Sequence, residues 1–123
     1  MAGLSYDINT LERGFPREAA FPHAPLGWTS EQARQIADDE GLTLTDEHWR
    51  VVRALQEFFA RNEEAGHINL RRLHDALDES FHGQGGIKHL YTLFPGGPIA
   101  QGCRLAGLKA PFIAADPSFG SVA

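Results

Sequence analysis

A single cysteine, Cys103, is the residue of this sequence best suited to covalent chemistry. It lies in LFPGGPIAQGCRLAGL, between a Pro-Gly-Gly-Pro turn and Gly107. A cysteine reacts as its thiolate, which forms where positive charge and partial exposure lower the thiol pKa. Arg104 and Lys109 supply positive charge nearby. Because free cysteines are also among the most often buried residues, the sequence leaves both a sulfur-bearing or redox-active thiol and a buried structural cysteine open.

Histidines are the next candidates for chemistry, as metal ligands. His67, His74, His82 and His89 follow one another at steps of seven, eight and seven. A structural zinc site needs four ligands, usually in close pairs, and one cysteine cannot complete it. The pattern therefore favours solvated surface histidines, and we expect no metal. The glycines at 83–86 lack the strand context of a nucleotide-binding loop, so no cofactor is expected.

Arginines on two predicted helices raise the alternative of a nucleic-acid-binding regulator. The residues concerned are Arg50, Arg53, Arg61, Arg71 and Arg72. A dedicated nucleic-acid binder usually has a strong basic excess. The net charge here is −5, with −6 over residues 1–49 and +2 over residues 50–109. This distribution favours a protein partner and disfavours nucleic acid.

The totals predict one domain over residues 1–123, because the length and the 42% of hydrophobic residues suffice for one modest core. The longest apolar runs are far shorter than a membrane span. The N-terminus MAGLSYDINTLERG lacks the basic flank and apolar core of a secretory signal. One cysteine cannot form an intrachain disulfide. We therefore expect a cytoplasmic protein without membrane contact.

Residues 28–107 predict a helical body, in which apolar residues recur at three- and four-residue steps. Thr29 and Asn69 suit helix N-caps, and Gly107 suits a helix end. Trp49, Val52, Leu55, Phe58 and Phe59 form the clearest apolar stripe. The predicted helices run from about Thr29 to Gly41, from Thr45 to about Asn62, from Asn69 to about Phe81, over about Ile87–Phe94, and from Pro98 to Gly107.

Both ends of the chain lack helical periodicity. Residues 1–27 predict an extended segment with a short β-hairpin over 4–16, and 21–27 read as an extended connector. Residues 108–123 contain two prolines and no apolar period, and predict a flexible C-terminal arm. The expected fold is mainly α: a compact orthogonal bundle of about five short helices with a small N-terminal β-hairpin and this arm.

Two long motifs carry a resemblance to a known family. GLTLTDEHWRVVRALQEFF (41–59) and LYTLFPGGPIAQGCRLAGL (90–108) resemble the DsrC/TusE sulfur-relay family, also called the gamma-subunit family of dissimilatory sulfite reductase. The match covers roughly residues 28–111. The resemblance implies a cytoplasmic helical domain that passes persulfide sulfur, with DsrEFH- or TusBCD-like sulfurtransferase complexes or sulfite reductase as partners. It also implies a sulfur-bearing cysteine near the end of a C-terminal arm.

The sequence departs from that family pattern at the arm. Cys103 matches the upstream cysteine of the DsrC type, whereas the arm-cysteine position, eleven residues later, is Ala114. Cys103 thus gains a third interpretation, as a remnant of an ancestral cysteine pair. The resemblance favours an accessory or regulatory protein of sulfur metabolism that is not an autonomous enzyme. The alternatives are a single-thiol carrier that uses Cys103, as in tRNA 2-thiolation, and the nucleic-acid-binding regulator.

Overall fold

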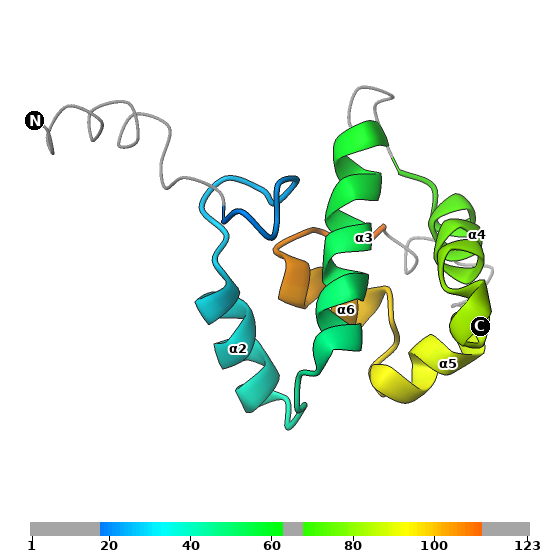
Figure 1. Ribbon diagram of the computed structural model, residues 1–123. Helices are drawn as coiled ribbons and strands as arrows, with labels where there is room; N and C mark the ends of the chain where they lie inside the picture. Colours follow the sequence, from blue (N-terminus) through cyan, green and yellow to red (C-terminus); the bar gives the residue numbers. More distant parts are fainter. Residues whose placement is uncertain (1–17, 63–67, 112–123) are drawn as a thin grey trace, which may run out of the picture.

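Five α-helices and one 3-10 turn make up the regular structure of residues 18–62 and 68–111, which are the residues that the computed structural model describes (Figure 1). No strand occurs within these ranges, so this part confirms the mainly helical prediction. The elements are α2 (Ser30–Asp39), α3 (Asp46–Asn62), α4 (Leu70–Ser80), the 3-10 turn η2 (His82–Gln84), α5 (Gly86–Leu93) and α6 (Ala100–Ala106).

Local capping signals fix three of the helix ends, as predicted. The Thr29 hydroxyl accepts the backbone N–H of Gln32 at 3.1 Å. The Asn69 side chain accepts the backbone N–H of Arg72 at 3.1 Å. Each bond satisfies one of the N–H groups that a helix start leaves without a partner. Gly107 ends α6 in the left-handed conformation, at a φ of 79°.

The longest helix, α3, forms the centre of the molecule. It packs against α6 and α4, and α6 packs in turn against α2. Figure 1 shows α3 between α2 on one side and α4 on the other, with α6 behind it. Val52 and Leu55 of the predicted stripe are fully buried, whereas Trp49, Phe58 and Phe59 are only partly buried. The buried face of α3 is therefore centred on Val51, Val52 and Leu55 and not on the aromatic residues of the stripe.

Two details of the prediction are corrected, and two lie outside the described residues. Residues 18–28 form successive turns and not an extended connector, because Phe21, Ala24 and Trp28 each donate their backbone N–H to the carbonyl three residues earlier. The last helix begins at Ala100 and not at Pro98. The predicted hairpin over 4–16 and residues 112–123 of the predicted arm lie outside the described part. No helix in the described part is long and apolar enough to cross a membrane.

Candidate functional site

The Cys103 thiol lies in the hydrophobic core. It sits near the middle of α6, and its exposed fraction is 1%. The helix carries it between α2 and α3, and the neighbouring Leu105 and Ala106 are equally buried. In this conformation the residue is almost completely shielded from solvent. A reagent or a partner protein can therefore meet the thiol only after part of the structure moves.

Burial also changes the acidity of this thiol. It raises the Cys103 pKa from an ordinary value of 9.0 to about 12, because the core disfavours the charged thiolate. Arg104, which follows Cys103, directs its guanidinium to Glu40. The side chain of Lys109 is exposed at the surface. At neutral pH the sulfur is thus a protonated thiol, which is a weak nucleophile.

A carboxylate from the end of α2 holds the outer side of α6. Glu40 accepts from Arg104 Nε at 2.8 Å and Nη2 at 3.0 Å, and from Gln101 Nε2 at 2.8 Å. Gln101 Oε1 in turn accepts the backbone N–H of Gly96 at 3.0 Å. The bonds from Arg104, and next those from Gln101, lower the pKa of Glu40 below its ordinary range. We call Glu40, Gln101 and Arg104 the outer clasp.

Two buried side chains hold the C-terminal end of the same helix. Trp28 Nε1 donates to the carbonyl oxygen of Leu105 at 2.8 Å. Gln56 Nε2, from α3, donates to the carbonyl oxygen of Ala106 at 3.0 Å. These bonds satisfy carbonyls that a helix end leaves without an intrahelical partner. We call Trp28 and Gln56 the inner anchors.

Two glycines of the motif allow α6 its close packing. A Cβ atom at Gly102 would lie 2.8 Å from Leu55 Cδ1 of α3, and one at Gly107 would lie 2.6 Å from Trp28 Cδ1. Such distances are shorter than real Cβ contacts, so a larger residue would displace its neighbour. The position of α6 is thus fixed by close packing at Gly102 and Gly107 and by the hydrogen bonds of Gln101 and Arg104. In the described part, the main role of the sequence around Cys103 is therefore to pack and hold α6.

His48 is a structural residue that the sequence analysis missed. Its Nδ1 accepts the backbone N–H of Thr45 at 3.0 Å, and its Nε2 lies 2.8 Å from the carbonyl oxygen of Leu93. Because a carbonyl only accepts, Nε2 carries the proton. The ring also packs edge-on against Phe94, with centroids 4.9 Å apart. His48 therefore connects the start of α3 with the end of α5; its position within the EHW motif was the available signal.

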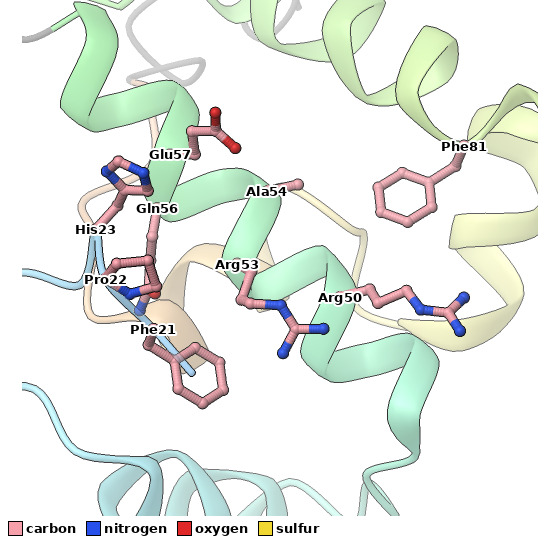
Figure 2. Close-up of a pocket in the computed structure, with 9 residues that line it drawn as sticks. All are labelled: Phe21, Pro22, His23, Arg50, Arg53, Ala54, Gln56, Glu57 and Phe81. Atoms are coloured by element: carbon pink, nitrogen blue, oxygen red, sulfur yellow. The ribbon is translucent and has the colours of Figure 1, made fainter. Parts of the chain in front are cut away.

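Arg50 and Arg53 of α3 line an open hollow of about 370 Å³. Figure 2 shows residues 21–23 on one side of it, Phe81 on the other, and Arg50 and Arg53 between them. The Arg53 guanidinium lies over the Phe21 ring, 5.5 Å from its centroid. Gln56 also lines the hollow, and its Oε1 is buried without a hydrogen-bond partner in the described part. A buried amide oxygen in this state is destabilising unless water reaches it.

The remaining arginines do not extend this surface into one basic patch. Arg61 pairs with Glu57 on the same helix. Arg71 lines a different hollow, of about 770 Å³, together with Tyr91 and the turn at 95–97. The described residues thus distribute the positive charge over separate hollows, which gives little support to a nucleic-acid surface.

The remaining candidates from the sequence are the histidines, as metal ligands, and Ala114. Among the described residues, no three His, Cys, Asp or Glu side chains gather in a way that could hold a metal ion. His89 instead pairs with Glu47, at 3.0 Å between Nε2 and Oε2, and so ties α5 to α3. Ala114, at the position of the family's arm cysteine, lies outside the described residues, and so does His67.

Comparison with known proteins identifies relatives over most of the chain. The family described as DsrC like protein matches residues 13–113. Sulfurtransferase TusE from Escherichia coli (strain K12) is 34% identical over 106 residues, which is 85% of this chain and 90% of the relative. Sulfurtransferase TusE from Salmonella typhimurium (strain LT2) is 35% identical over 106 residues, again 85% of this chain and 90% of the relative. No solved structure gives a significant match.

Proposed function

Because this chain belongs to the DsrC-like protein family, we propose that it works in a cytoplasmic sulfur relay as an accessory protein of the sulfur-transferring components. The proposed partners are TusBCD- or DsrEFH-like sulfurtransferase complexes or sulfite reductase. In this proposal the protein docks on the partner and modulates the transfer, while the sulfur stays on the partner. The protein then has no enzymatic activity of its own.

The state of Cys103 is the observation that supports an accessory role. A sulfur carrier needs a thiolate that a donor persulfide can reach. The chain contains one cysteine, its side chain is 1% exposed, and burial raises its pKa to about 12. The position of the family's arm cysteine holds Ala114, whose methyl group cannot bind sulfur.

Intact-mass spectrometry after incubation with a small-molecule persulfide tests this role. We expect the native protein to keep its mass, because the donor cannot reach Cys103. The same protein in urea serves as the positive control, since unfolding exposes the thiol, and Cys103→Ala in urea serves as the blank. In parallel, calorimetric titration with a purified TusBCD-type complex should detect binding that Cys103→Ala preserves. Absence of binding to both the sulfurtransferase complex and sulfite reductase would contradict the docking role.

A single-thiol carrier is the second candidate, favoured by the name sulfurtransferase that the relatives bear. In this reaction the Cys103 thiolate attacks the outer sulfur of a donor persulfide. The bond between the two donor sulfurs breaks, a new persulfide forms on Cys103, and the donor leaves as its thiolate. No oxidant is needed. A stable added sulfur on the native protein that disappears in Cys103→Ala would establish this candidate and overturn the accessory role.

A further inference from the structure

Any reaction of Cys103 requires a motion that exposes the sulfur, and α6 is the element that carries it. This helix has seven residues, too few to be stable by itself in water. It is therefore held by its packing against α2 and α3 and by hydrogen bonds from the inner anchors and the outer clasp.

The two sets differ in their contact with water. In the outer clasp, the side chains of Arg104 and Glu40 are 52% and 25% exposed, so water can replace the bonds of this pair as they break, whereas Gln101 is only 5% exposed. The inner anchors Trp28 and Gln56 are 6% and 1% exposed. Breaking their bonds would leave carbonyls and donors buried without partners, which costs much more free energy. The pair of Glu40 and Arg104 should thus release at a lower free energy than the inner anchors.

We propose that Glu40 is a latch on α6, and that its release lets the N-terminal part of α6 swing away from α2 and expose Cys103. Glu40 bonds to Gln101 and Arg104, two positions before and one position after the cysteine. The inner anchors keep the C-terminal end in place, so the helix turns about Leu105 and Ala106. α6 lies against α2 at this side (Figure 1).

This inference is independent of the proposed accessory role, and for the single-thiol candidate it names the step that regulates sulfur loading. A partner that binds Arg104 through its own carboxylate would release the latch, because Arg104 is the more exposed member of the pair. The thiol would then become reachable without unfolding of α3 or α4.

Alkylation of the native protein by iodoacetamide, followed by mass spectrometry, tests the latch without any sulfur donor or partner. We expect Glu40→Ala to raise the labelling rate of Cys103 about fivefold, the size expected from a partly exposed bidentate pair with one further hydrogen bond. Glu31→Ala is the matched control. Glu31 also lies on α2 and pairs with an arginine, Arg34, but its pair is confined to α2. We expect this variant to label at the wild-type rate.

Two further measurements separate a local opening from global unfolding. Labelling in low urea should depend only weakly on urea concentration, since swinging one short helix exposes little surface. Arg104→Ala should also accelerate labelling, and the double variant should add little to Glu40→Ala, because both changes break the ion pair between Glu40 and Arg104. Equal rates in Glu40→Ala and wild type, an equal increase in Glu31→Ala, or labelling that follows the urea dependence of global unfolding would overturn the proposal.

Discussion

The indole of Trp28 and the backbone of Leu105 are joined by a hydrogen bond of 2.8 Å, although 77 positions of sequence separate them. The bond connects the turn before α2 with the last residues of α6. Trp28 also packs edge-on against Phe21, with ring centroids 4.8 Å apart. One side chain thus anchors both the N-terminal turns and the helix that carries the cysteine.

Replacing Trp28 by phenylalanine should lower the free energy of unfolding by about 2 to 3 kcal/mol. Phenylalanine keeps one aromatic ring in this place, but the Leu105 carbonyl loses its donor and a small cavity forms where the second ring was. Urea unfolding followed by circular dichroism measures the change. Trp49→Phe is the control, because Trp49 is only partly buried and its indole makes no hydrogen bond in the described part. This control should lower the free energy of unfolding by less than about 1 kcal/mol. Equal losses in the two variants would contradict a role for the indole N–H.

Gly102→Ala should destabilise the protein by about 1 to 2 kcal/mol, although alanine is the better helix former. The new Cβ would meet Leu55 Cδ1, which is fully buried. The double variant Gly102→Ala/Leu55→Ala should be more stable than the sum of the two single changes predicts, because each offsets the other. Gly83→Ala is the control, since a Cβ at that position would have nothing within 4 Å. Strict additivity in urea unfolding would disprove this contact.

The buried thiol should make stability fall at alkaline pH. The Cys103 pKa is raised in the folded state from 9.0 to about 12, so the folded protein keeps its proton where the unfolded chain loses it. The contribution of the buried thiol to stability is complete below pH about 9 and is lost as the pH rises toward about 12. The difference in unfolding free energy between wild type and Cys103→Ala should thus shrink across this window. A constant difference would show that the thiol is not shielded.

The outer clasp should weaken at acid pH. The Glu40 pKa is lowered in the folded protein, chiefly by the hydrogen bonds from Arg104. Its contribution to stability is present above the unfolded value of about 4.5 and is lost as the pH falls through the lower folded value. As the pH falls below about 4.5, the melting temperature of Glu40→Gln in thermal scans should therefore decrease less than that of wild type. Identical acid profiles would show that Glu40 ionisation does not stabilise the fold.

Features that depend on near neighbours in sequence were predictable. Thr29, Asn69 and Gly107 end or begin their helices through bonds or backbone angles set within a few residues. The apolar spacing located the five helices of the described part because a helix must bury one face. The turns at 18–28 were misread because prolines mark both extended segments and turns, and only the backbone hydrogen bonds of Phe21, Ala24 and Trp28 decide between them.

Features that depend on distant residues were not predictable. The sequence placed Arg104 beside Cys103, but the partner of its guanidinium is Glu40, 64 positions away. The depth of Cys103 in the core likewise follows from the packing of α2 and α3 around α6. His48 and Gln56 read as polar helix residues until their acceptors, Leu93 and Ala106, are known.

The anchoring of α6 has a consequence for the order of folding. The side chains that hold α6 belong to residues 28, 40 and 56, and their partners in α6 lie 50 to 77 positions later. Closing such long loops is entropically slow, and a ribosome releases α6 after all of these side chains. We therefore expect the nascent chain to present a reactive cysteine until α6 docks, and the finished protein to enclose it.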